Sequence, residues 1–327
     1  MFLTGSVICS PVKTLKRRPV EDISVWKGMT VSELCRMYSG AGGFSAKKLA
    51  TSVEIMLDMK ADKNCVKFLS FPACICATGT RGVIRQMLEE KMVDVVITTC
   101  GTLDHDIARV WKDYFHGEFE LDDVELFKKG MYRLGNIVIP TGNYGKILED
   151  KMTEFLDDIV KDKKKWSTKD IVWELGKRLD KTSILYWAWR NKIPIFIPGI
   201  TDGAVGSQLW MYYQCHRDFA IDMFQDEDDL AEIVFKAKKT GALILGGGIS
   251  KHHTIWWNQY RGGLDYAVYI TTAEEYDGSL SGARLREAIS WGKLRANAKH
   301  VTLEGDATIL LPLMVAALIG DKKKHRR

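Results

Sequence analysis

The sequence lacks the features that mark secreted, membrane and nucleic-acid-binding proteins. No apolar run approaches the roughly 20 residues that span a bilayer. The start, MFLTGSVICSPVKTLKRR, places apolar residues before basic ones, which is the reverse of a signal peptide. The seven cysteines are odd in number and irregularly spaced, which favours a reducing compartment, and the small basic excess gathers at the chain ends. We therefore expect a cytoplasmic protein with no membrane and no nucleic-acid partner.

An alternation of short apolar runs and helical patterns fills the chain instead. The expected strands are residues 66–70, 93–98, 136–139, 194–197, 242–245, 266–270 and 301–303. The expected helices are residues 30–37, 45–60, 80–91, a segment from about 104, 147–160, 168–179 and 230–239. Strands that are apolar throughout are typical of parallel sheets covered on both faces. The pattern predicts one large α/β domain over residues 29–320, doubly wound and Rossmann-like, with a mostly parallel sheet and helices on both faces. An N-terminal extension (1–28) and a basic C-terminal tail (321–327) flank it.

Polar, glycine-rich loops follow four of the expected strands, at residues 98–106, 198–207, 246–253 and 271–284. Because the carboxyl ends of parallel strands share one edge of the sheet, we expect these loops to form one polar site. The three glycines at 246–248 let a phosphate approach the backbone, although no GxGxxG fingerprint is present. Asp202 and Asp306 are candidates for holding ribose hydroxyls.

Two adjacent histidines, His252 and His253, follow this glycine run. In an extended segment their rings face opposite ways, so at most one is expected to point into the site. A zinc site needs further ligands at suitable spacing. Cys74 and Cys76 form a CxC pair, but the segment around them, FPACICATG, is typical of an apolar loop, so no metal is expected.

The segment EAISWGK offers a nucleophile at Lys293. Glu287 and Trp291 are four residues apart and share one helix face. An indole beside a lysine disfavours the ammonium, which makes the neutral amine available for attack. Residues alone leave two alternatives open, a surface lysine at a helix end and Lys251 as the reactive lysine.

Several long motifs resemble deoxyhypusine synthase. They are LILGGGISKHH, DYAVYITTAEEYDGS followed by SGAR, and EAISWGK, with TDGAVG upstream and GDAT downstream, and the similarity runs from about residue 45 to 315. The resemblance implies a homotetramer with active sites shared between two subunits of a dimer, and NAD as the redox cofactor. It also implies transfer of the aminobutyl group of spermidine, through an imine on a lysine, to one lysine of the hypusine-bearing translation initiation factor precursor.

The resemblance also implies roles for individual residues. Lys293 carries the imine, His252 lies near the reacting carbon, and residues 1–28 can cover the active-site entrance. Substrate-binding positions are Asp104, His105, Ser207, Gly278, Ser279, Leu280, Glu287 and Trp291. NAD-binding positions are Thr99, Cys100, Gly101, Asp202, Gly247, Thr272, Ala273 and Asp306, and the loop at 73–77 occupies a further one.

The chain departs from the family pattern in its tunnel carboxylates. Asp104 and His105 stand where the family has an acidic pair, and Ser207 and Leu280 replace aspartates. Asp104 and Glu287 are expected to remain for an ammonium group. The departures suggest an archaeal-type branch with altered amine recognition, or another donor such as agmatine. Two alternative functions stay open: a homospermidine synthase, which transfers the group to putrescine, and a catalytically silent NAD-binding homologue.

Overall fold

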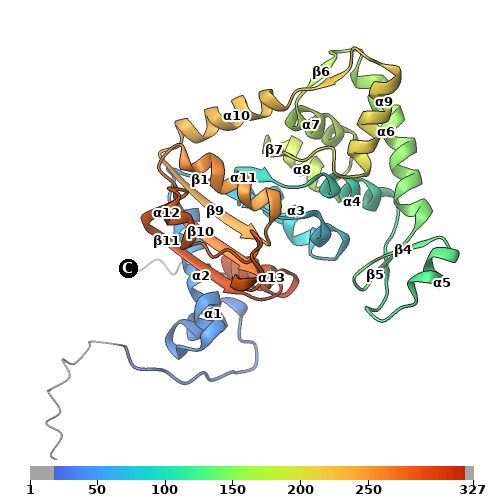
Figure 1. Cartoon of the computed structure of the whole chain (residues 1–327). Coiled ribbons are helices and arrows are strands. Elements are labelled where there is room, and N and C mark those ends of the chain that lie inside the picture. The colour runs from blue at the N-terminus through green and yellow to red at the C-terminus, as the bar shows by residue number, and fades with distance from the viewer. Residues whose placement is uncertain (1–17, 321–327) are drawn as a thin grey trace, which may run out of the picture.

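A computed structural model describes residues 18–320 and places a six-stranded parallel sheet at their centre (Figure 1). The strands lie in the order β11-β10-β9-β1-β2-β7. Their bounds are β1 Cys65–Ser70, β2 Val95–Ile97, β7 Ile195–Phe196, β9 Lys239–Leu245, β10 Leu264–Thr271 and β11 Leu294–Glu304. From β1 the chain adds β2 and β7 on one side and then β9, β10 and β11 on the other. The winding therefore reverses between β1 and β9, and the doubly wound α/β prediction is confirmed.

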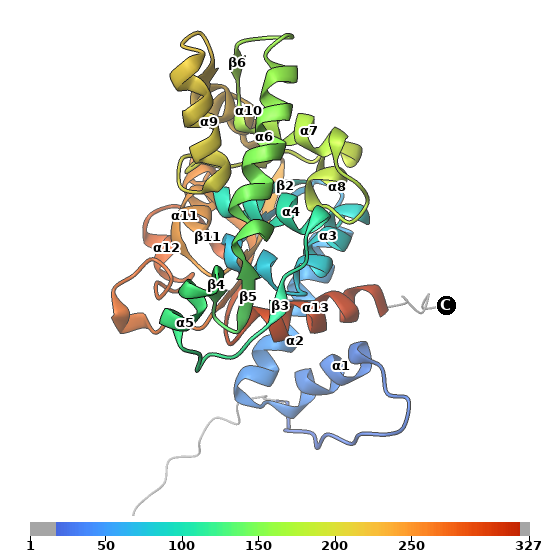
Figure 2. The same cartoon turned by 90° about the vertical axis from the view of Figure 1, so that its right-hand side faces the viewer.

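Helices cover both faces of this sheet, as Figures 1 and 2 show. Successive strand residues point to opposite faces, so Phe68 packs in one apolar cluster and Leu69 in the other. The Phe68 cluster includes residues of α10 (Met223–Lys236), α11 (Gly248–Gln259) and α12 (Glu287–Ser290). The Leu69 cluster includes residues of α1 (Val31–Ala41), α2 (Phe44–Ala61), α3 (Arg81–Glu89), α4 (Cys100–Trp111), α6 (Gly145–Ile159), α7 (Thr168–Arg178), α8 (Ile184–Asn191), α9 (Ala204–Cys215) and α13 (Ala307–Gly320).

The strand expected at 136–139 does not join the main sheet, which corrects the sequence prediction. It is β5 (Ile137–Pro140), which pairs antiparallel with β3 (Phe115–His116) and β4 (Met131–Leu134) in a small lobe that includes α5 (Asp123–Lys128). Only Gly135 and Asn136 separate β4 from β5, and Gly135 has a φ of +60°. So short a turn makes an antiparallel hairpin, because a parallel neighbour needs a crossover of a dozen or more residues.

Several element boundaries also differ from expectation. The helix expected near 104 begins at Cys100, and the one expected at 230–239 is α10, which starts at Met223 because the Asp222 carboxylate caps it. The histidine pair lies on α11 rather than in an extended segment. The capping box predicted at Thr30 and Glu33 is confirmed. A short parallel pair, β6 (Lys165–Trp166) and β8 (Ala220–Ile221), completes the strands of the described range.

The structure describes only part of the predicted N-terminal extension and none of the predicted C-terminal tail. Residues 18–28 contain no helix or strand, whereas residues 1–17 and the basic tail at 321–327 lie outside the described residues. Between residues 18 and 320, no helix combines the length and the apolar character that a bilayer crossing requires.

Candidate active site

A cavity of about 360 Å³ opens at the carboxyl edge of the sheet, where the winding reverses between β1 and β9. Ligands bind at this position in doubly wound folds, and the volume lies in the range of small-molecule sites. Gly246 lines the cavity just before α11, and Asp306, Ala307 and Thr308 line it at the start of α13. The positive ends of two helix dipoles therefore meet at the cavity, and this arrangement fits the phosphates of a dinucleotide.

The predicted cofactor residues are divided between this cavity and its surroundings. Thr272 and Asp306 line the cavity, and so do Cys74 and Ile75 of the 3₁₀ turn at Ala73–Ala77. The Thr99 hydroxyl accepts a hydrogen bond from the backbone of that turn. The other predicted residues are absent from the lining: Cys100, Gly101, Asp202, Gly247 and Ala273. Cys100 is fully buried in the core, so its thiol is a packing group in this chain.

The small antiparallel lobe supplies a cavity wall that the sequence reading missed. Leu134, Gly135 and Asn136, the hairpin turn between β4 and β5, lie against the same cavity. The Arg133 guanidinium donates to the Gly135 carbonyl and to both oxygens of Asp123, which braces the turn. The Gly-Asn pair was the available signal, since it favours a tight hairpin.

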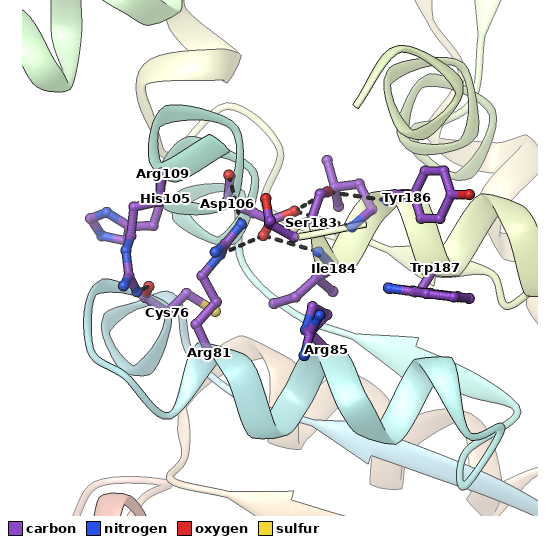
Figure 3. Close-up of polar contacts among 12 residues, drawn as sticks. Cys76, Arg81, Arg85, His105, Asp106, Arg109, Ser183, Ile184, Tyr186 and Trp187 are labelled. Carbon is purple, nitrogen blue, oxygen red and sulfur yellow. Dashed lines mark hydrogen bonds and ion pairs between the residues drawn. The ribbon is translucent and has the colours of Figure 1, made fainter. Parts of the chain in front are cut away.

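A buried polar network fixes the 3₁₀ turn that lines the cavity (Figure 3). Asp106 receives hydrogen bonds from Arg81, from the Ser183 hydroxyl and from the first backbone N–H groups of α8, and so joins α3, α4 and α8. One turn along α4, the Arg109 guanidinium donates to the carbonyls of Cys76 and Thr78, at 2.8 and 2.6 Å. The turn is therefore held from behind by α4.

Lys293 lies three residues beyond Ser290, the last residue of α12. Gly292 has a φ of +67°, and the Lys293 N–H bonds the Ala288 carbonyl, so the helix ends in a glycine cap that places the lysine next. The side chain is only 8% exposed. Its Nζ lies 5.2 Å from the ring centre of Trp256 and 5.1 Å from that of Trp291. Within residues 18–320 this side chain makes no hydrogen bond or ion pair, and its nitrogen lies against the two indole rings.

The rings of the two histidines point in different directions, as their adjacency predicted: His252 lies near Lys293 and His253 does not. Burial, and secondarily the charge of Lys293, lower the pKa of His252, so its ring is neutral at pH 7 and can take up a proton. His253 instead packs toward α10, with Nε2 3.4 Å from a Glu227 oxygen, and burial lowers its pKa to about 4. On a helix, neighbouring side chains point about 100° apart, which separates the two rings by less than a strand would but still sends them to different neighbours.

Lys251, the rival lysine, has a different setting. Its Nζ donates to the carbonyls of Leu280 and Ala283, at 2.7 and 2.6 Å, and lies over the Tyr269 ring. Burial lowers its pKa to about 8. Its protons hold the loop between β10 and α12 in place, which makes it a structural anchor.

Asp104 and His105 are buried in the chain described alone, so a contact between Asp104 and an ammonium stays a prediction. The Asp104 carboxylate accepts from the backbone N–H groups of Ala204 and Val205 and from the Tyr144 hydroxyl. It therefore caps α9. Burial raises its pKa and lowers that of His105 to about 4. The His105 ring bonds the hydroxyl of Tyr114, 3.1 Å away.

The other substrate positions lie on two exposed segments. Ser207 is exposed on α9 and bonds the Gly203 carbonyl, so it offers a hydroxyl in place of a charge. The segment from Gly278 to Leu280 belongs to the loop that Lys251 anchors. Glu287 is exposed on α12, where it accepts from the Arg284 N–H. None of the residues around Lys293 lines the cavity, so one chain presents two separate parts of a site.

No group of three or more metal-ligating side chains occurs in the described part of the chain. The arrangement offers a cavity beside two helix N-termini and, apart from it, a buried lysine amine.

Comparison with known proteins bears on this arrangement. The family model for deoxyhypusine synthase matches residues 33–318. A protein of Picrophilus torridus described as "Probable deoxyhypusine synthase" is 55% identical over 306 residues, covering 93% of this chain and 98% of the relative. One of Ignicoccus hospitalis with the same description is 47% identical, covering 94% and 98%. A solved structure from Entamoeba histolytica, assigned to the same family, has a TM-score of 0.62 at 23% identity and covers 90% of this chain and 94% of its own, which supports the fold. The chain therefore belongs to the deoxyhypusine synthase family of transferases, in its archaeal branch.

Proposed function

We propose that this chain transfers the aminobutyl group of spermidine, or of a related amine, to one lysine of a hypusine-bearing translation initiation factor. The group is carried as an imine on Lys293. The observation that carries this proposal is the setting of that lysine: a buried amine between two indoles, with no hydrogen-bond or ion-pair partner in residues 18–320. No hydrogen bond or ion pair among the described residues has to break for this nitrogen to attack a substrate carbon.

The residues around Lys293 can hold and move protons. His252, neutral because its pKa is lowered, can accept the proton that the amine sheds as it attacks the substrate carbon. Bound NAD would supply the redox chemistry: a hydride leaves the amine carbon before 1,3-diaminopropane is released, and it returns once the group has reached the acceptor lysine. Gly246, Thr272 and Asp306 are the cavity residues that would hold it.

The separation of Lys293 from the cavity supports a site completed by a second copy of the chain. Hydride exchange requires the cofactor beside the amine, and Lys293 is not among the cavity residues. Large apolar side chains are exposed on the surface of the chain, including Trp210 of α9 and Phe224 of α10. Such surfaces mark protein interfaces, and we propose a homotetramer with sites shared within a dimer. A cytoplasmic location fits the six free cysteines of the described range.

Borohydride reduction of the enzyme with NAD and labelled spermidine tests the proposal. The expected product is a reduced adduct on Lys293, and addition of the factor before reduction should move the label to the factor. Label that moves only to putrescine would instead identify a homospermidine synthase. A protein that binds NAD but forms no adduct with any amine would be a silent homologue.

A further inference from the structure

The amine site has an aromatic wall that extends beyond the family motifs, because Trp256 and Tyr260 follow the motif that ends at His253. On α11 the rings of His252, Trp256 and Tyr260 follow one another at intervals of four residues, so they form a row on one face of the helix. The ring centres of His252 and Trp256 are 5.5 Å apart, and those of Trp256 and Tyr260 are 6.2 Å apart. Trp291, the C-cap residue of α12, brings a second indole to 5.1 Å from the Lys293 nitrogen.

Both indoles are within cation–π range of the Lys293 nitrogen, since that interaction extends to about 6 Å from a ring centre. Trp256 is 38% exposed and Trp291 is 71% exposed, so neither ring is consumed by the core. A molecule that joins this nitrogen therefore lies against indole faces.

The charges expected around the amine are few. Ser207 and Leu280 stand where carboxylates were expected, and Asp104 is buried and occupied with capping α9. Of the acidic residues expected at the amine, Glu287 alone is exposed. Aromatic faces attract cations through the ring quadrupole and also cover an aliphatic chain, so they can replace part of a lost carboxylate set.

We propose that Trp256 is a specificity-determining residue that, with Trp291, forms an indole clamp for the cationic aliphatic amine. This inference rests on the proposed function and names how the same site binds its donor. The clamp holds the ammonium of the free amine by cation–π contact and shields the apolar chain from water. It also lies against the positively charged nitrogen once the amine is joined to Lys293.

Substitutions of Trp256 test the clamp. Trp256→Asn removes the aromatic face, whereas Trp256→Phe keeps a smaller one. Spermidine binding to the full-length enzyme is measured by calorimetry with NADH present, because the reduced cofactor cannot accept hydride and no turnover begins. We expect the spermidine Kd to rise about tenfold in Trp256→Asn and no more than about threefold in Trp256→Phe.

Trp257→Phe is the matched control on the same helix. The Trp257 indole faces away and donates to Glu227 on α10, so the spermidine Kd should stay at the wild-type value. NADH affinity should be equal in all four proteins, which excludes a general loss of structure. The KM for spermidine should rise in Trp256→Asn more than kcat falls.

Three results would overturn the clamp: an unchanged spermidine Kd in Trp256→Asn, equal losses in the Asn and Phe variants, or no spermidine binding by the wild type. Failure of the proposed function looks different. In that case the wild type binds spermidine with the Trp256 dependence described, yet borohydride traps no adduct.

Discussion

Lys251 and Lys293 are two buried lysines of the same C-terminal half, and their surroundings differ in kind. Lys251 is 2% exposed and gives its protons to two backbone carbonyls. Lys293 is 8% exposed and has only ring faces near its nitrogen. The first lysine must keep its hydrogens to hold a loop, and the second has no hydrogen bond to lose when it reacts.

Burial therefore does not by itself identify a reactive lysine. A depressed pKa points to Lys251, whereas the lack of a hydrogen-bond or ion-pair partner within residues 18–320 points to Lys293. We place the covalent chemistry at Lys293, because a nucleophile must reach its substrate with a free electron pair and Lys251 is enclosed by its own loop.

The largest expected effect is the loss of transfer in Lys293→Arg. Arginine keeps the positive charge but does not become a neutral nucleophile. We expect the transfer rate to fall on the order of 10⁴-fold or more, with NAD affinity largely unchanged. Label transfer from spermidine and NAD titration measure the two effects, and full activity in this variant would return attention to Lys251.

Next in size is the stability loss in Lys251→Met, which leaves the Leu280 and Ala283 carbonyls without their donor. The free energy of unfolding should fall by about 1–3 kcal/mol in a urea titration. Lys293→Met is the matched control and should stay within about 0.5 kcal/mol of wild type, because no hydrogen bond is lost. Equal losses in both variants would contradict the contrast between the two lysines.

A smaller effect is expected on the cofactor side from Arg109→Ala. This change removes the two hydrogen bonds that fix the turn beside the cavity. The Kd for NAD should rise about tenfold, while the spermidine Kd stays the same. Arg85→Ala is a suitable control, since the Arg85 guanidinium bonds the Lys181 carbonyl and not the turn. A parallel rise in the spermidine Kd would show that the two parts of the site are not separable.

The smallest expected change is the one that each pH unit makes in the free energy of unfolding, through the titration of Lys251. Its pKa is about 8 in the folded chain against an ordinary value of 10.5, so between these values the unfolded chain binds the extra proton. Its stabilising contribution is then complete above about pH 10.5 and is lost as the pH falls through about 8. Relative to the always-charged Lys251→Arg, wild-type unfolding free energy should rise by about 1 kcal/mol per unit across this window. A constant difference between the two proteins in urea titrations would show that the lysine does not titrate there.

The sequence predicted what local patterns and long motifs can carry. Continuous apolar runs gave the strands of the main sheet, and Thr30 with Glu33 gave the start of α1, because both signals depend on neighbouring residues. The family motif predicted Lys293 as the lysine that carries the imine, and this role stays a prediction. The hairpin at Gly135 was predictable in type, yet its place beside the cavity was not, because the lobe packs there through contacts distant in sequence.

Sequence alone determined the doubly wound fold, the family and the lysine that follows the helix-ending glycine, since each is written in contiguous residues. Only the tertiary structure decided which charges are available. Asp104 caps a helix that begins 100 positions later, Lys251 holds a loop some 30 residues away, and Trp256 and Trp291 both come within cation–π range of the Lys293 nitrogen. Hydrogen bonds and burial between distant segments set these assignments, and no local pattern records them.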